Sequence, residues 1–153
     1  MSVGENTVNV YRVREAAKLP YRAHLDDAGM DFFFAPIDTV AVRIAPGQTA
    51  LLSTGVKVEV PPGCMLQVMN KSGVAYKRQL LVGACVVDHG YTGEIFVNLH
   101  NVGKDIEIVN PGTKIAQGVF MNVRTPILVE VTEDNIYGEN TSRGDGALGS
   151  TGS

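Results

Sequence analysis

Apolar and polar residues alternate with a period of two through most of the chain, in short runs. This alternation is typical of β-strands that bury one face. The runs are VNVYRV (8–13), TVAVRIAP (39–46), VKVEVPPG (56–63), CMLQVMN (64–70), EIFVNLHN (94–101), IEIVNPG (106–112) and ILVEVTE (127–133). Proline, glycine, asparagine or aspartate, the residues that favour turns, close most of them. The pattern predicts an all-β fold, either a sandwich, a barrel or a jelly roll.

Two segments depart from this alternation. KSGVAYKR (71–78) is the one stretch that favours a short helical turn. Beyond residue 132 the apolar pattern fades, and the chain ends in the glycine-rich segment RGDGALGSTGS (143–153). Ordering such a segment costs about 1–2 kcal/mol per residue, so a ligand would have to stabilise it. We therefore predict a folded domain over 1–132 and a flexible C-terminal arm over 133–153.

Composition and net charge limit the classes of function that are expected for this chain. The chain of 153 residues suits one domain, and its net charge of −3 gives no overall attraction to nucleic acid or to an anionic membrane. No apolar run long enough to cross a membrane and no signal peptide occur, so we expect a cytoplasmic protein, or a nucleoplasmic or host-cytosolic one if the source is eukaryotic or viral. Cys64 and Cys85 lie in apolar runs and are expected to be reduced thiols.

Several polar residues interrupt the apolar runs. Asp31 in DDAGMDFFFA (26–35) could orient water bound to magnesium, or it could be a turn aspartate facing solvent. Ser72 and Gly73 follow Lys71 at the start of the expected helical turn. Free N–H groups there attract anions, although a simple helix cap beside a solvated lysine would have the same sequence. Gln117 interrupts GTKIAQGVF (112–120) and needs hydrogen-bond partners from the backbone or from a ligand.

The segment GACVVDHGYTGEI (83–95) predicts a β-hairpin with a carboxylate near its tip. Backbone groups of such a hairpin could bond the edge of a flat base, and Tyr91 could offer its ring to a sugar. Asp88 could hold and polarise a water molecule. The alternative is a turn aspartate and a tyrosine that only packs.

Taken in order, the segments AGMDF, KSGVA, GACVVDHGYTGEI, GTKIAQ and RGDGALGSTG resemble the ordered motifs of the trimeric dUTP pyrophosphatases, the dUTPases. The resemblance runs from about residue 28 to residue 152. It implies a distorted jelly-roll subunit in a homotrimer, with active sites at subunit interfaces. It also implies hydrolysis of dUTP to dUMP and pyrophosphate with Mg²⁺, which lowers dUTP and supplies dUMP for thymidylate synthesis.

The resemblance assigns a role to each motif. Asp88 would hold the attacking water, and Asp31 would contact Mg²⁺ through water. The phosphates would be contacted by Lys71, Ser72, Gly73 and Gln117. The uracil would be bound by the backbone of Cys85, Val86 and Val87 and by Phe96, and Tyr91 would pack under the deoxyribose and exclude a 2′-hydroxyl. The arm would close over the nucleotide through Arg143, Leu148, Gly149, Ser150 and Thr151.

Three positions depart from the family pattern. Lys71 stands where the family has arginine, so the charge is kept but the rigid two-pronged guanidinium is lost. Cys85 replaces a glycine beside the base pocket, and Leu148 replaces an aromatic residue that covers the base. We expect a competent enzyme with a looser lid.

Two alternatives remain open on the same fold. A dCTP deaminase would need a carboxylate acid/base, typically glutamate, near the base, and an arginine-rich helix after a Ser-Ser pair, where this chain has Gly73. A protein-binding regulator could use the nucleotide as a switch. In either enzymatic interpretation, neither a membrane nor a nucleic acid is an expected partner.

Overall fold

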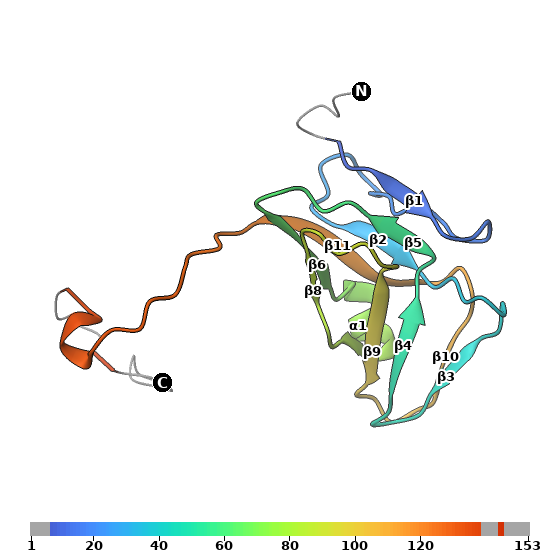
Figure 1. Ribbon diagram of the computed structural model, residues 1–153. Helices are drawn as coiled ribbons and strands as arrows, with labels where there is room; N and C mark the ends of the chain where they lie inside the picture. Colours follow the sequence, from blue (N-terminus) through green and yellow to red (C-terminus); the bar gives the residue numbers. More distant parts are fainter. Residues whose placement is uncertain (1–6, 139–143, 146–153) are drawn as a thin grey trace.

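The computed structural model describes residues 7–138 and 144–145, and within them the chain forms short antiparallel strands with one short α-helix (Figure 1). The all-β prediction is confirmed. A four-stranded sheet has the order β2 (Met30–Phe33), β11 (Lys114–Asn122), β6 (Cys64–Met69) and β8 (Val86–Asp88). A three-stranded sheet has the order β4 (Thr49–Ser53), β9 (Phe96–Asn101) and β7 (Leu80–Val82). This layering of antiparallel strands agrees with the expected jelly roll.

Two ribbons and a helix complete the described structure. One ribbon pairs β1 (Val10–Arg12) with β5 (Val56–Val58), and the other pairs β3 (Val42–Ile44) with β10 (Glu107–Val109). The helix α1 (Ser72–Arg78) joins β6 to β7, and a 3₁₀ turn spans Glu133–Asn135. None of the described helices is long and apolar enough to cross a membrane.

The hydrophobic core is formed by the apolar faces of the strands. On β9 the side chains of Val97 and Leu99 are fully buried, whereas Phe96, the first residue of the strand, is 42% exposed. Gly118 on β11 marks a close approach within the core, because a Cβ there would lie 2.5 Å from the ring of Phe32. On β9 the two-residue period therefore sets which face of the strand is buried.

The segment 83–95 is not the paired hairpin that its sequence predicts. β8 is the edge strand of the four-stranded sheet and pairs with β6, whereas β9 is the central strand of the other sheet and pairs with β4 and β7. Each arm finds a partner strand elsewhere, so the chain crosses between sheets at the turn 89–93. As an edge strand, β8 presents one row of backbone N–H and C=O groups outside the sheet ladder.

The segment 127–133, which the alternation predicts as a strand, is not a strand in the described structure. It runs away from the body of the molecule (Figure 1), and Ile127 and Leu128 are 90% and 92% exposed. A strand needs a neighbour to pair with, and this segment lies beyond the sheets of its own subunit. By contrast, β4 and β7 form although their sequences lack a clear alternation, because β9 lies between them.

The short helix is confirmed, but its cap differs from the simplest expectation. α1 begins at Ser72, and Lys71 occupies the N-cap position with no side-chain hydrogen bond to the helix. Ser72 is therefore the first helical residue and its side chain is not needed as a cap. Its hydroxyl and the exposed Gly73 face outward at the start of the helix.

Candidate active site

Asp31, Lys71 and Gln117 come from distant parts of the sequence and line one cavity of about 250 Å³, together with residues of the 23–29 loop. Their convergence follows from strand pairing. Gln117 on β11 lies opposite Asp31 on β2 and opposite Met69 on β6, and Lys71 comes two residues after Met69. The sheet therefore brings three of the sequence-predicted residues to one place.

Asp31 is 4% exposed and lies between two lysines. The ammonium of Lys71 donates to Oδ1 at 2.7 Å, and the ammonium of Lys114 lies 2.8 Å from Oδ2. Burial alone would raise the pKa of Asp31, but contacts with Lys114 and Lys71 outweigh it and hold the pKa below its ordinary value. Asp31 is therefore an anion paired with two cations in the folded subunit.

Lys114 is a site residue that the sequence reasoning missed. Its ammonium lies over the ring of Tyr21, 5.1 Å from the centroid, besides its contact with Asp31. The Asp31 carboxylate, followed by Tyr21, raises the pKa of Lys114 above its usual value. Its position on β11, three residues before Gln117, was the available indication, because β11 is the strand that pairs with β2.

The Asp31 carboxylate fits the expected metal contact through water. Oδ2 is buried and, despite the nearby lysine, has no aligned hydrogen bond. Mg²⁺ keeps several of its waters and is held by one or two carboxylates plus substrate phosphates. Among the residues that the structure describes, no cluster of three or more histidine, cysteine or acidic side chains could hold a metal directly. Asp31 and Asp27 are the carboxylates among the residues that line this cavity, so a metal ion here would be contacted through its waters.

Of the residues expected to bind phosphate, Lys71 and Gln117 line the cavity, and Ser72 and Gly73 are exposed at the start of α1. Gly73 has open space where a Cβ would stand, so a ligand can approach the backbone at the start of α1. Gln117 donates from Nε2 to the carbonyl of Asn70 at 2.9 Å. A Cβ at Gly29 would overlap the amide end of the Gln117 side chain, so a larger residue there would displace that side chain. Gln117 is thus held by the backbone, and its amide oxygen lies beside the cavity.

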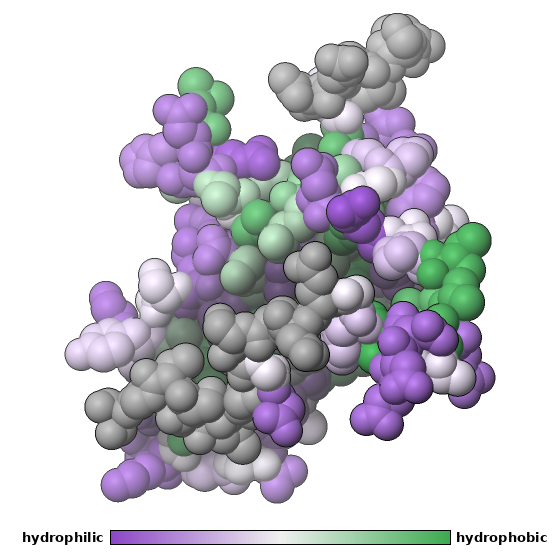
Figure 2. Space-filling view, turned by 90° about the vertical axis from the view of Figure 1, so that its left-hand side faces the viewer, coloured by the Kyte–Doolittle hydropathy of each residue, from purple (hydrophilic) through white to green (hydrophobic). Residues whose placement is uncertain are grey.

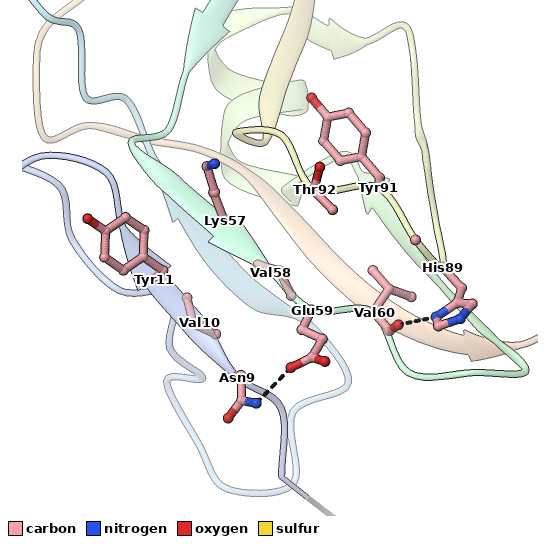
Figure 3. A pocket seen from close by; sticks show the side chains of 11 residues that line it. Asn9, Val10, Tyr11, Lys57, Val58, Glu59, Val60, His89, Tyr91 and Thr92 are labelled. Carbon is pink, nitrogen blue, oxygen red and sulfur yellow. Dashed lines mark hydrogen bonds between the residues drawn. The ribbon is translucent and has the colours of Figure 1, made fainter.

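Asp88 lies exposed at the end of β8, opposite Met65 on β6. Three residues later Tyr91, which is 46% exposed, donates its hydroxyl to the carbonyl of Glu94 at 2.9 Å. The turn is also anchored by the ring of His89, whose Nδ1 lies 2.8 Å from the carbonyl of Val60. A pocket of about 390 Å³ lies between this turn and the ribbon of β1 and β5 (Figure 3).

The backbone expected to bind the base runs along the edge of the sheet. The carbonyl of Cys85 accepts the N–H of Val68 at 2.7 Å, and β8 pairs with β6 from Val86 onward. Cys85 is a free thiol, as expected. Phe96 starts β9 across the crossing from β8. The arm residues Arg143, Leu148, Gly149, Ser150 and Thr151 lie outside the described residues.

Within one subunit the sheet separates Asp88 from the cavity of Asp31. Through its neighbour Gln117 on β11, Asp31 lies level with Met69 of β6, whereas Asp88 lies directly opposite Met65 of β6. Four residues along a strand and three strand spacings across the sheet amount to about 13 Å and about 14 Å, so the two carboxylates are about 19 Å apart. Both side chains of one subunit therefore cannot reach the same phosphate group.

Comparisons with known proteins agree with this arrangement of motifs. The family model named dUTPase matches residues 15–152. The chain is 37% identical over 145 residues to the deoxyuridine 5'-triphosphate nucleotidohydrolase of Clostridium kluyveri, covering 94% of this chain and 96% of that protein. It is 41% identical over 148 residues to the protein of the same name from Gloeothece citriformis, with 95% and 96% covered.

Solved structures give the same result. The dUTPase of Staphylococcus bacteriophage 80alpha with dUPNHPP superposes with a TM-score of 0.82 at 27% identity, covering 97% of this chain and 99% of that one. A variant dUTPase from phage phi11 of S. aureus, described with a structural Mg(II) ion, superposes with a TM-score of 0.76 at 28% identity, with 84% and 98% covered. On its sequence, its motifs and its fold, the chain belongs to the dUTPase family.

Proposed function

We propose that this protein is a dUTP diphosphatase, which hydrolyses dUTP to dUMP and pyrophosphate by attack of water on the α-phosphate. The observation that carries this proposal is the meeting of Asp31, Lys71 and Gln117 in one cavity. That cavity combines a buried anion, a cation and an amide, which suits a magnesium triphosphate. The reaction lowers dUTP and supplies dUMP for thymidylate synthesis, and we place it in the cytoplasm, or in the nucleoplasm or host cytosol.

Asp88 acts on the attacking water in this proposal. Its carboxylate is exposed at the end of a strand, so it can orient a water molecule and accept its proton. Phosphoryl transfer needs little covalent help and depends on positioning and on neutralising charge. When bound, Mg²⁺ supplies positive charge to the triphosphate. Asp31, which lines the cavity, would hold this ion through water.

The phosphates are bound by Lys71, by the backbone of Ser72 and Gly73, and by Gln117. Lys71 is paired with Asp31 in the structure, and a triphosphate gives its ammonium a second anionic partner. Ser72 and Gly73 are exposed at the start of α1, and the open space at Gly73 would let phosphate oxygens approach their N–H groups. The arm residues Arg143, Leu148, Gly149, Ser150 and Thr151 close over the nucleotide in this proposal.

The base and the sugar are bound at the crossing between β8 and β9. The outer edge of β8 at Val86 and Val87, together with the preceding Cys85, would offer backbone groups for uracil, and Phe96 would also contact the nucleotide. Tyr91 packs its ring under the deoxyribose. Its hydroxyl is already bonded to Glu94, so the ring is held in place before substrate binds.

We further propose a homotrimer with active sites at the subunit interfaces. The separation of about 19 Å between Asp31 and Asp88 means that a complete site needs both carboxylates from different subunits. The exposed segment 127–133 extends away from the body of the molecule (Figure 1), and hydrophobic residues reach the surface in patches on that side (Figure 2). A neighbouring subunit would provide the partner strand that this segment lacks. The partners of the chain are then dUTP and two further copies of itself.

The test is pyrophosphate release from dUTP, UTP, dCTP and dTTP with Mg²⁺. We expect rapid release from dUTP and far less from the other nucleotides, and replacing Asp88 by asparagine should lower the rate with dUTP by a factor of about 10² to 10⁴. Asp105→Asn is the matched control, because Asp105 is exposed on a different turn. Equal rates with all nucleotides would contradict base recognition at β8. Release of ammonia from dCTP would instead indicate a deaminase.

A further inference from the structure

The turn that carries Tyr91 is tied to the N-terminal part of the chain by a two-pronged ion pair. Arg14 donates from Nη1 to Oε1 of Glu94 at 2.8 Å and from Nη2 to Oε2 at 2.7 Å. Oε1 also accepts the backbone N–H of Gly55 at 2.7 Å. The Arg14 and Glu94 side chains are only 17% and 12% exposed. Paired, charge-assisted bonds of this kind fix geometry better than a single bond does.

Arg14 is itself held at the position from which it reaches Glu94. Its Nη1 also donates to the carbonyl of Ala35 at 2.7 Å. Gly55 has a φ of +70°, and a Cβ there would lie 2.5 Å from Cβ of Ala17 and 2.8 Å from Nη1 of Arg14. Glycine is therefore required at position 55 both for the backbone conformation and for the approach of the guanidinium. The Arg14–Glu94 pair is a built contact between three segments of the chain.

This contact determines where the Tyr91 ring lies. The carbonyl that accepts the Tyr91 hydroxyl belongs to Glu94 itself, and a Cβ at Gly93 would overlap the ring. The next residue, Ile95, is bonded through its N–H to Val56 at 2.9 Å. The main chain under the ring is thus fixed by the bond of Ile95 to Val56 on β5 and by the contacts of the Glu94 carboxylate with Arg14 and Gly55.

We propose that Arg14 and Glu94 are positioning residues that set the preference for deoxyribose over ribose. The inference rests on the proposed function, in which the Tyr91 ring leaves no room for a 2′-hydroxyl. To exclude a single hydroxyl group, the Tyr91 ring must keep a fixed position. If the Arg14–Glu94 pair is broken, the Glu94 carbonyl and the Tyr91 ring can shift, and the ribose of UTP can then enter. Neither Arg14 nor Glu94 needs to touch the nucleotide.

The experiment compares kcat/KM for dUTP and for UTP in the wild type and in Glu94→Gln. Glutamine keeps an oxygen for the N–H of Gly55, but it presents an amide donor to the donors of Arg14, so the two-pronged contact is lost. We expect the ratio of the two kcat/KM values to fall about tenfold or more, because small displacements of positioning groups have large kinetic effects. In Glu94→Gln, the difference between the affinities of dUMP and UMP, measured without turnover, should also become smaller.

The control is Glu107→Gln, which removes the Arg78–Glu107 ion pair of the same 2.7 Å length, with side chains 25% and 23% exposed, away from the Tyr91 turn. It should leave the ratio unchanged. If Glu94→Gln does not fold, Arg14→Lys keeps the charge and loses the two-pronged contact, and it should lower the same ratio less. A folded variant that loses rate equally with both nucleotides, or that keeps the wild-type ratio, overturns the inference. A wild type that does not hydrolyse dUTP refutes the proposed function instead.

Discussion

Replacing Asp31 by asparagine is expected to destabilise the folded protein at pH 7 through its charge. Asparagine has the same shape, so the change leaves Lys71 and Lys114 close together without the buried carboxylate between them. Removing one partner of a fully buried ion pair costs about 3–5 kcal/mol. The two lysine side chains are 31% and 36% exposed, so solvent screens them, and we expect a loss of about 2 kcal/mol for Asp31. For a chain of this size, that loss lowers Tm by about 4–8 °C.

The effect has a defined dependence on pH. The pKa of Asp31 is lowered in the folded state from a reference value of 3.8. Its contribution to stability is therefore fully present above pH 3.8 and is lost as the pH falls through the lower, folded-state pKa. The difference in stability between the wild type and Asp31→Asn should accordingly shrink as the pH falls below about 4.

The assay is unfolding by urea or heat, followed by circular dichroism from pH 7 down to the lowest pH at which the wild type is still folded. Protein concentration is held constant, because the stability of an oligomer depends on it. Glu107→Gln, at the partly exposed pair with Arg78, should show a smaller loss at pH 7. A loss for Asp31→Asn that stays constant across the pH range, or no loss at pH 7, would refute the role given to the Asp31 charge.

Three further predictions address the arm, the interface and the core. Deleting residues 143–153 should abolish turnover and leave the oligomer intact, as measured by pyrophosphate release and by sedimentation; normal turnover would contradict the lid. Leu128→Asp should shift the sedimentation profile toward smaller species, because it places a charge in the apolar segment that we assign to a neighbouring subunit; an unchanged profile would contradict that assignment. Gly118→Ala should destabilise the subunit by about 1–3 kcal/mol in urea, because its Cβ would lie 2.5 Å from the Phe32 ring and 2.9 Å from Cδ1 of Leu66; full stability would show that the core yields.

The class of the fold could be predicted from the sequence because strand formation leaves a pattern among residues that are neighbours along the chain. A two-residue period decides which side chains of a strand face the core, and Val97 and Leu99 on β9 are buried as that period requires. The helix at 72–78 is also local, since it depends on residues within one or two turns. The ordered motifs identified the family, and the comparisons confirm it.

The positions of the site residues could not be predicted, because contacts between distant strands decide them. Alternation around Asp31 and Gln117 says nothing about which strand pairs with which, and only the register of β2 with β11 brings them together. The same pairing gives Asp31 a second cation, Lys114, that no motif had indicated. The arms of the expected hairpin separated because β8 and β9 pair with strands of different sheets.

The sequence by itself therefore determined the strand class, the short helix and the kinds of side chain available for catalysis. Tertiary structure alone decided that three of those side chains share a cavity and that Asp88 lies far from them in the same subunit. It also decided that the ion pair of Arg14 and Glu94 holds the Tyr91 turn. The physical reason is the same in each case: periodicity is set by neighbours along the chain, whereas strand pairing and buried charge contacts join residues far apart in it.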